Sequence, residues 1–468
     1  MNQILSIDIG TSSLKAGIIS EQGKLLEYGR EYYAPGLQSS PRTWISMLQN
    51  MVKSFTAAKI DAIAVSGHGP SLVPATALAE NSFQAIGWDA KIKIAENIKA
   101  LAPNINTSFF LAKALYFKEN FPEQYKAISF FLPPPELLNL YLSGQARSIL
   151  PNSEYRHFYW DDLSIKAMGL KTEHFAPFIA PGETLGTLQK NPAKALGLKP
   201  GMPVFAAGPD FLMALLGSGT VSEGLVCNRM GSSEGMNLLV NQKINTTTLL
   251  QFPHLVPGKI NLSGIINASG LAIEWFLRLT GIKRQDLSAL SNQVFTQFSL
   301  DNSILFIPHL LPSRTPLWPE NLKGSLLGLE AHHGKEDVFQ ALMEGLLFFA
   351  KDILVEMEKH ADIKEIRLSG GPAENIAWLK MKASLFSKPL SLLEINDSEL
   401  LGNALIATHR APLDKIQEHI ASRIHVKSII SPDSSLSDYI QNKYQNYRAI
   451  SSQINRLFKT ENPLSALK

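Results

Sequence analysis

Cysteine is almost absent from this sequence, since Cys227 is the only one among 468 residues. A single cysteine allows no disulfide within the chain and no cluster of cysteine metal ligands. This usage fits a reducing compartment, and we expect a cytoplasmic protein.

Long apolar runs are also missing. No stretch reaches the length that a transmembrane helix needs, and Asp8 interrupts the apolar run near the start that a secretory signal would require. We therefore expect neither a membrane partner nor a signal peptide. Hydrophobic residues make up 45% of the chain and charged residues 18%, a balance typical of soluble globular proteins.

Neither sign of charge dominates. The chain has 44 basic and 41 acidic residues, and its aromatic residues are not interleaved with Lys and Arg as they are in nucleic-acid-binding proteins. We therefore expect no nucleic-acid partner. Low-complexity segments and long linkers are absent as well, which leaves an ordinary folded chain.

A chain of this length exceeds one hydrophobic core, so we expect two domains with a cleft between them. Strand and helix patterns alternate along the sequence, which indicates α/β domains. We place the boundary near Gly219, giving domains over residues 1–219 and 220–468, because a glycine- and hydroxyl-rich turn at 231–235 predicts the start of a new sheet.

Apolar periodicity predicts the main elements. The first three strands, over residues 4–26, should form a meander with turns at Gly10 and Gly23. The other expected strands cover residues 60–65, 203–209, 225–230, 236–240 and 365–369. The expected helices cover residues 42–53, 108–120, 135–143, 211–216, 337–359, 374–387 and 439–458.

The first turn begins with a carboxylate. Asp8 can hold hydrated Mg²⁺, Gly10 lets the backbone approach a phosphate, and Lys15 can add positive charge. The hydroxyls between them are further donors, from Thr11, Ser12 and Ser13. Asp-x-Gly-Thr is also an ordinary hairpin-turn composition, and taken alone the motif favours that simpler interpretation.

A second turn of this kind contains Gly231, Ser232 and Ser233. Between the two turns, Asp210 follows the apolar strand expected at 203–209. A carboxylate at a strand end is held firmly at the edge of a sheet, where it can act in catalysis. It can equally cap the helix that begins at Phe211, and the residues alone do not decide between these roles.

Four separated segments, in this order and spacing, resemble the FGGY family of carbohydrate kinases. The resemblance extends over nearly the whole chain up to about residue 410. The segments that carry it are Asp8 to Lys15, Pro203 to Gly219, Met230 to Ser233, and a C-terminal group containing Phe306 to Leu310, Arg314 to Trp318, Ala341 to Gly345, Leu368 to Gly371, Asn375, Trp378 and Glu399.

The resemblance implies two actin/hexokinase-like (ribonuclease H-like) α/β domains that flank a cleft. It implies ATP and Mg²⁺ as cofactors, transfer of the γ-phosphoryl group to a hydroxyl of a small sugar or polyol, and Asp210 as the general base. A homodimer is the assembly that it suggests. Asp8 is implied as the metal residue, and the implied nucleotide contacts are Asp8, Gly10, Thr11, Ser12, Lys15, Gly231, Ser232, Ser233, Gly270, Glu274, Gly370, Gly371 and Asn375.

The implied acceptor side combines polar and aromatic groups. The loop containing His68 and Gly69 resembles the Met-His-Gly loop of xylulokinase-like members, where the imidazole can bond a sugar hydroxyl. Trp88 and Asp89 stand where the family carries its Trp-x-Asp-x-Arg motif, and an aromatic face with a carboxylate suits a sugar. Asp210 and its neighbour Phe211 complete this side.

Departures from the family pattern cluster on the acceptor side. Lys91 stands where Arg is usual, in a motif one residue short, and Ser66 replaces the customary Gln. Phe211 replaces a polar residue, and residues 134–136 read Pro-Pro-Glu rather than Lys-Asp-Tyr. The phosphate motifs are kept while polar sugar contacts are changed, so we expect an acceptor other than ordinary xylulose, or one held differently.

Two other classes of protein share parts of this pattern. One is a kinase-like protein that binds a nucleotide or ligand but has lost or altered transfer, and the retained Asp8 and Asp210 weigh against it. The other is an actin-like polymer or chaperone ATPase, which would not need the segments at 306–310 and 314–316. An active carbohydrate kinase remains the favoured function.

Overall fold

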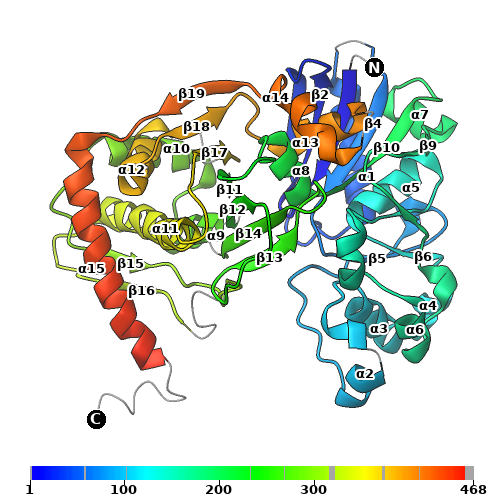
Figure 1. The fold of residues 1–468 in the computed structure, drawn as a ribbon, viewed down its shortest axis with the longest axis horizontal. Helices are drawn as coiled ribbons and strands as arrows, with labels where there is room; N and C mark the ends of the chain where they lie inside the picture. The colour runs from blue at the N-terminus through cyan, green and yellow to red at the C-terminus, as the bar shows by residue number, and fades with distance from the viewer. Residues whose placement is uncertain are drawn as a thin grey trace. The chain divides into compact units, whose positions relative to one another are not determined.

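The computed structural model describes residues 3–56, 59–101, 103–231, 233–267, 269–315, 322–370, 375–409 and 412–458. The chain forms two compact units, coloured along the sequence in Figure 1. Unit 1 comprises Met1–Gly219, Leu255–Pro257 and Ser398–Ile424, and unit 2 comprises Thr220–His254, Gly258–Asp397 and His425–Lys468. The single domain boundary expected near Gly219 does not describe this division completely. The segment Ser398–Ile424 follows most of unit 2 in the sequence but belongs to unit 1.

Unit 1 is built on a six-stranded sheet with the order β3-β2-β1-β4-β10-β9. The predicted meander is confirmed, since β2 pairs antiparallel with both β1 and β3. Strands β4 and β10 then extend the sheet in parallel with β1. The strands are β1 (Gln3–Ile9), β2 (Ser13–Ser20), β3 (Leu25–Tyr32), β4 (Ala62–Gly67), β9 (Thr184–Thr187) and β10 (Pro203–Pro209), with short pairs β5 (Val73–Ala75) with β6 (Phe130–Leu132) and β7 (Ser148–Ile149) with β8 (Phe178–Ile179).

The helices expected in unit 1 at 42–53, 108–120, 135–143 and 211–216 are confirmed with small shifts of their ends, while the others were not predicted. In α1 the side chains of Trp44, Leu48 and Met51 repeat at helical spacing and are buried in the core of this unit. The helices are α1 (Pro41–Ser54), α2 (Glu96–Leu101), α3 (Leu111–Asn120), α4 (Pro122–Ala127), α5 (Pro134–Ser143), α6 (Asp162–Ala167), α7 (Lys190–Leu196), α8 (Asp210–Gly217), α13 (Ser398–Thr408) and α14 (Ile416–Ala421).

Two of these helices, α8 and α13, pack with their backbones in close contact. A methyl group at Gly402 of α13 would overlap the carbonyl oxygen of Met213 in α8, and one at Gly217 of α8 would overlap that of Ser398. Helix α13 also packs on β1, β4 and β10, and in Figure 1 it lies, in orange, against the blue strands of this sheet. A helix from late in the sequence therefore supports the first strand.

Unit 2 contains a separate seven-stranded sheet with the order β13-β14-β12-β11-β17-β18-β19. This confirms the expectation that the turn at 231–235 belongs to a new sheet. Strand β11 pairs antiparallel with β12 and parallel with β17, the arrangement that β1 has with β2 and β4. The strands are β11 (Leu225–Met230), β12 (Glu234–Val240), β13 (Leu250–Pro253), β14 (Ile260–Ile266), β17 (Glu365–Ser369), β18 (Leu390–Leu393) and β19 (Val426–Ile430), with a separate pair β15 (Leu305–Ile307) and β16 (Ser325–Leu327).

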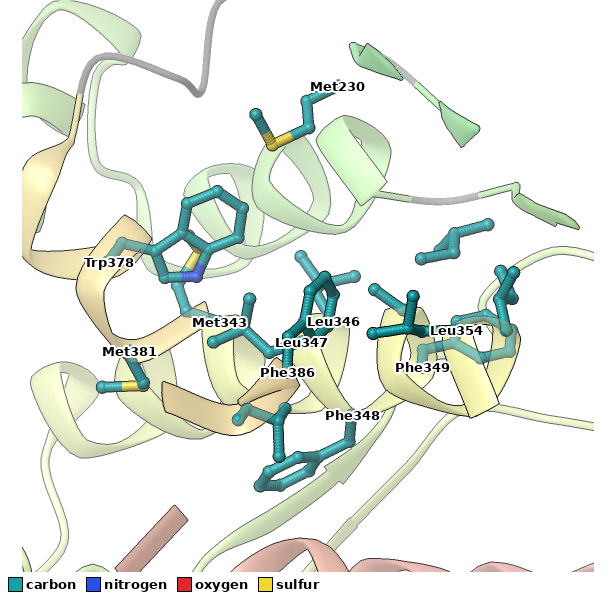
Figure 2. Packing of buried hydrophobic residues seen from close by; sticks show 14 of the residues in the cluster. Met230, Met343, Leu346, Leu347, Phe348, Phe349, Leu354, Trp378, Met381 and Phe386 are labelled. Atoms are coloured by element: carbon teal, nitrogen blue, oxygen red, sulfur yellow. The ribbon is translucent and has the colours of Figure 1, made fainter. Parts of the chain in front are cut away.

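The helices of unit 2 enclose a large apolar core. Side chains of α11 and α12 meet in it, as Figure 2 shows for Leu346, Phe349, Trp378 and Phe386. The predicted helices at 337–359 and 374–387 are confirmed with small shifts of their ends. The helices are α9 (Ser269–Thr280), α10 (Leu287–Thr296), α11 (Lys335–Glu358), α12 (Ile376–Phe386) and α15 (Ser434–Phe458).

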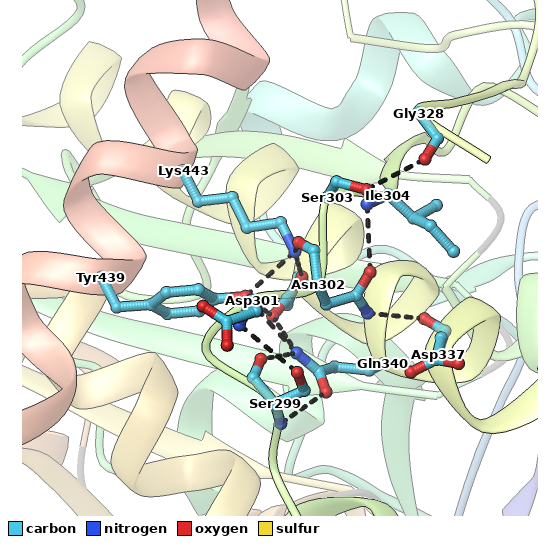
Figure 3. A network of polar contacts seen from close by, with 11 residues as sticks. Ser299, Asp301, Asn302, Ser303, Ile304, Gly328, Asp337, Gln340, Tyr439 and Lys443 are labelled. Atoms are coloured by element: carbon cyan, nitrogen blue, oxygen red, sulfur yellow. Dashed lines mark hydrogen bonds and ion pairs between the residues drawn. The ribbon is translucent and has the colours of Figure 1, made fainter. Parts of the chain in front are cut away.

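The C-terminal helix α15 is attached to α11 by buried polar contacts. The Lys443 ammonium lies 2.5 Å from Oε2 of Glu344 and donates at 2.7 Å to the carbonyl oxygen of Asn302. Gln340 and Tyr439 extend this network, which Figure 3 shows from close by. The predicted tail helix is confirmed, although it begins at Ser434 rather than at residue 439.

None of the helices in the described part of the chain has both the length and the apolar composition of a membrane span.

Candidate active site

Three parallel strands of unit 1 end side by side. Ile9 of β1 pairs with Gly67 of β4, and Gly67 pairs with Pro209 of β10. Because the carboxyl ends of parallel strands meet at one edge of the sheet, residues at these ends gather in space. Asp8, His68 and Asp210 stand at or beside these ends, so the structure brings the three sequence-predicted residues to one edge.

Asp8 is fully buried and has polar partners on two sides. Its Oδ1 accepts a hydrogen bond from Ser66 Oγ at 2.9 Å, and its Oδ2 lies 3.4 Å from the ammonium of Lys15, its cross-strand partner. A buried carboxylate needs such partners because removing it from water is costly. Ser66, noted in the sequence only as a departure from the family pattern, thus contacts the predicted metal residue.

Helix α13 adds two further groups beneath this carboxylate. Asn403 donates through Nδ2 to Ser66 Oγ at 3.0 Å and to the carbonyl oxygen of Ile7 at 2.9 Å. Glu399 lies 3.8 Å from Lys15, so this ammonium stands between two carboxylates. Asn403 is a site residue that the sequence did not identify, because nothing local distinguishes it from other residues of an apolar helix.

The first turn has the predicted form. The Gly10 amide donates to the carbonyl oxygen of Ser13 at 3.0 Å, which closes the turn, while Thr11 and Ser12 are exposed. A Cβ at Gly10 would lie 2.9 Å from the same oxygen and 3.7 Å from Asp8 Oδ2. Glycine therefore lets the turn close without a side chain beside the carboxylate.

Asp210 is the first residue of α8 and is half-buried. Its Oδ1 accepts a hydrogen bond from the amide of Phe211 at 2.7 Å. A carboxylate in the first helical turn is also favoured by the helix dipole. The helix starts at Asp210 rather than at Phe211 and its N-cap residue is Pro209, so the capping role considered from sequence is wrong. Asp210 stands in the first turn of α8, at the edge of the sheet.

His68 lies near two other residues of the predicted acceptor side, Asp89 and Asp210. Burial lowers the pKa of its imidazole, and the negative charges of Asp210 and Asp89 partly oppose that shift. Its Nδ1 lies 2.9 Å from Ser71 Oγ, and Trp44 packs edge-on against the ring. His68 is therefore neutral near pH 7 and can both donate and accept a hydrogen bond. Asp89 and Asp210 both lie close enough to act on it.

Trp88 and Asp89 lie in a turn that Ala90 closes through a hydrogen bond to Gly87. Trp88 is half-buried and Asp89 is exposed. Asp89 also acts on Lys113 of α3, where burial lowers the pKa of the ammonium to about 8 and the Asp89 charge opposes that shift. The sequence did not identify Lys113, although a lysine on the apolar face of a predicted helix is a usable signal.

Glu136 of α5 is a second buried group that the motifs did not assign a role. Its Oε1 accepts from the amide of Ile149 at 3.1 Å, and burial raises the pKa of its carboxyl to about 8. The preceding Pro135 packs against Gly67, since a Cβ at that glycine would be 3.1 Å from Pro135 Cδ. Pro135, one of the residues that depart from the family pattern at 134–136, thus packs against the residue that precedes His68.

In unit 2 the second turn connects β11 with β12. The Gly231 amide donates to the carbonyl oxygen of Ser233 at 3.0 Å, as Gly10 does to Ser13. The Gly270 amide, near the start of α9, donates to the carbonyl oxygen of Gly231 at 3.1 Å. Ser232 lies outside the described residues, so its part in this turn stays a prediction.

Three further predicted nucleotide contacts lie in the same unit. Gly370 has φ 96°, and a Cβ there would overlap the carbonyl oxygen of Met230, so only glycine fits. Asn375 caps α12 by accepting from the Trp378 amide at 2.9 Å, and its Nδ2 donates to Ser291 Oγ at 2.6 Å. Glu274 forms an ion pair with Arg284. Gly371 lies outside the described residues.

The donor set around Asp8 suits Mg²⁺ better than a softer metal. No group of three or more His, Cys, Asp or Glu side chains suited to a metal occurs in the described parts of the chain. A Mg²⁺ ion bound with a nucleotide needs only one or two carboxylates, because phosphates and water supply the other oxygens. The buried carboxylate of Asp8, beside Gly10, which places no side chain next to it, fits that requirement.

Comparisons with known proteins match both halves of the chain. Residues 3–217 match the model of the N-terminal domain, and residues 226–411 that of the C-terminal domain, of the FGGY family of carbohydrate kinases. A xylulose kinase of Lactococcus lactis is 26% identical, with 97% of this chain and 99% of the relative covered.

Solved structures show the same fold. A ligand-bound xylulose kinase from Lactobacillus acidophilus superposes with a TM-score of 0.77 at 18% identity, covering 98% of this chain and 99% of the other. A gluconate kinase from the same organism gives a TM-score of 0.77 at 17% identity over 98% and 99% of the two chains.

Proposed function

The chain belongs to the FGGY family of carbohydrate kinases, and we propose that it transfers the γ-phosphoryl group of ATP to a sugar or polyol hydroxyl with Asp210 as the general base. Kinases of this family use ATP and an alcohol acceptor. The observation that carries the residue assignment is the convergence of Asp8, His68 and Asp210 at the ends of three parallel strands.

Asp210 is suited to accept the proton of the acceptor. In the proposed step, its carboxylate takes the hydroxyl proton as the hydroxyl oxygen attacks the γ-phosphorus. The bond from that phosphorus to the oxygen bridging to the β-phosphate breaks, and ADP leaves with the electron pair. The product is a phosphate monoester. The hydrogen bond from the Phe211 amide fixes the carboxylate that receives the proton.

The nucleotide side is assigned to the two glycine turns. Asp8 would hold Mg²⁺, whose charge offsets that of the triphosphate. Thr11 and Ser12 offer exposed donors in the first turn, while Gly231 and Ser233 offer a matching turn in unit 2. Lys15, paired with Asp8, adds positive charge to the same region. The proposed acceptor side lies in unit 1, near Asp210. It is built from His68, Gly69, Trp88, Asp89 and Phe211.

The acceptor is proposed to differ from ordinary xylulose. Glu136 and Ser66 replace groups of the family pattern, and both are committed to contacts inside the protein, with Ile149 and Asp8 respectively. Phe211 adds an apolar surface next to Asp210. A buried hydroxyl without a partner costs about 1–3 kcal/mol, so these changes disfavour a substrate that needs the missing contacts.

ADP release measured with a panel of pentuloses, hexuloses, polyols and sugar acids tests this proposal. We expect clear turnover with at least one acceptor and weak turnover with D-xylulose. Efficient use of D-xylulose contradicts the acceptor assignment. Nucleotide binding without turnover on any acceptor contradicts the transferase proposal and favours a ligand-binding protein instead.

Two further proposals concern the protein in the cell. A kinase that uses ATP as its phosphoryl donor is expected in the cytoplasm. A homodimer is the proposed assembly, and analytical ultracentrifugation of the purified chain tests it.

A further inference from the structure

We propose that Lys382 and Glu234 are positioning residues for the second phosphate turn, holding it from beneath so that it binds the nucleotide. This inference rests on the proposed function, because it assigns the turn at Gly231 and Ser233 to nucleotide phosphates. Neither side chain belongs to a motif that carries the family resemblance.

The ammonium of Lys382 contacts both sides of the turn. It lies 2.6 Å from Oε1 of Glu234 and 3.6 Å from Sδ of Met230. Met230 and Glu234 are the register pair that closes the hairpin, the last residue of β11 and the first of β12. One side chain from α12 therefore touches the residues on each side of Gly231 and Ser233.

Glu234 extends the support to two other elements. Its Oε1 also accepts from Asn228 Nδ2 at 2.8 Å, and its Oε2 accepts from Ser269 Oγ at 3.2 Å. Ser269 is the first residue of α9, whose next residue, Gly270, donates to the carbonyl oxygen of Gly231. The carboxylate thus joins the turn to the start of α9.

The pair is fully dehydrated, with side-chain exposures of 0% for Lys382 and 1% for Glu234. The rings of Trp378 and Phe386 lie 5.0 and 5.6 Å from the ammonium, within reach for cation–π attraction. Figure 2 shows these rings and Met230 in the apolar core of unit 2. Apolar residues of similar volume are often as stabilising as a buried ion pair, so stability alone does not require these charges.

The position of α12 connects the pair with the other predicted nucleotide segment. Helix α12 begins next to Asn375 and follows the segment that starts at Gly370, and Gly370 itself packs against the carbonyl of Met230. Lys382 therefore fixes the phosphate turn relative to the helix that follows the predicted adenosine loop. A turn held in this way loses less conformational entropy when it binds phosphate, so its affinity for the nucleotide is higher.

The test is the double variant Lys382→Met with Glu234→Gln, which removes both charges and leaves neither one buried alone. We expect it to fold, with the dissociation constant for ADP and the KM for ATP raised about tenfold. The kcat at saturating ATP and the KM for the acceptor should change less than about threefold. Calorimetry measures ADP binding without turnover, and the coupled assay measures the kinetic constants.

A second buried lysine–glutamate pair in unit 2 supplies a matched control. Lys443 and Glu344 lie 2.5 Å apart, in a network that does not include the turn. Lys443→Met with Glu344→Gln should change thermal stability while ADP affinity stays within about twofold of wild type. An equal loss of ADP affinity in both double variants contradicts the inference, because a general effect on folding then explains it.

The remaining outcomes separate the two proposals. Unchanged ADP affinity in the Lys382 and Glu234 variant, with an active wild-type enzyme, overturns this inference and leaves the proposed function standing. A wild-type protein that binds no ADP overturns both.

Discussion

Ser66 donates a hydrogen bond from its hydroxyl to Asp8 Oδ1 over 2.9 Å, and both side chains are fully buried. Asn403 donates to the same hydroxyl from a helix 337 positions further along the sequence. The proposed metal residue is therefore oriented by a chain of hydrogen bonds that ends on α13. This relationship makes Ser66 a supporting residue of the phosphate site.

Ser66→Ala is predicted to weaken both folding and nucleotide binding. A hydrogen bond to a buried charged group contributes about 1.5–3 kcal/mol, and its loss should lower the free energy of unfolding by about that amount. The KM for ATP should rise because the Asp8 carboxylate loses its orientation. Chemical denaturation and steady-state kinetics measure the two effects. Ser6→Ala is the control, since Ser6 is buried on β1, the strand of Asp8, and its Oγ has no hydrogen bond among the described residues.

Asp210→Asn is predicted to lower kcat about 10²- to 10⁴-fold, the usual contribution of a general base. The ADP dissociation constant should stay within about twofold, because the Asn side chain keeps the shape and can still accept from the Phe211 amide. Coupled assays and calorimetry give the two numbers. Asp162→Asn provides the comparison, as Asp162 is also the first residue of a helix and is exposed. A kcat close to wild type in the Asp210 variant contradicts its assignment as the base.

Gly402→Ala is predicted to destabilise unit 1 and reduce activity. The added methyl would overlap the Met213 carbonyl, forcing α8 and α13 apart at a cost of about 1–3 kcal/mol or more. Because α8 carries Asp210 and α13 carries Asn403, kcat should fall together with the melting temperature. Differential scanning calorimetry and the kinase assay test this. Ala404→Gly, on the same helix, should cost about 1 kcal/mol without any overlap. A Gly402→Ala variant as stable as wild type would refute the packing argument.

Glu136 is predicted to make stability depend on pH. Burial raises the pKa of its carboxyl to about 8, above the value of the unfolded chain, so the folded form retains a proton that the unfolded form releases. The protonated carboxyl therefore contributes fully to the free energy of unfolding at low pH. As the pH rises toward about 8, this contribution falls by up to about 1.4 kcal/mol per pH unit.

Glu136→Gln should remove that dependence. The difference in unfolding free energy between the variant and wild type should shift in favour of the variant from about pH 5 to about pH 8 and become flat above that. Urea denaturation across this range measures it. Glu119→Gln, at an exposed position of α3, is the control and should leave the pH slope of wild type unchanged. Parallel pH slopes for Glu136→Gln and wild type would show that the buried carboxyl does not titrate as inferred.

The sequence was sufficient to predict the parts of the fold that depend on local pattern. The first meander, the strand before Asp210 and the second turn with its new sheet were all predicted from apolar runs and turn residues, and the structure confirms them. The family was predicted from the order of the motifs.

The supporting residues could not be predicted in this way because their partners are remote in sequence. Asn403 and Lys382 occupy ordinary positions of apolar helices, and their roles depend on contacts with Ser66 and Glu234. The return of α13 to unit 1 has no local signal either. For Lys382 the one usable hint is a charged residue at a position where the helical period predicts burial.

The division of unit 1 between two distant stretches of sequence affects how a nascent chain can fold. The sheet that carries Asp8 leaves the ribosome long before Ser398–Thr408, the helix that covers it. About 180 residues separate these parts, and synthesis proceeds at about 5–20 residues per second. The helix is therefore synthesised roughly 10–40 s after the sheet that it covers. During translation, the binding of chaperones to this exposed apolar surface is expected to persist until that helix emerges.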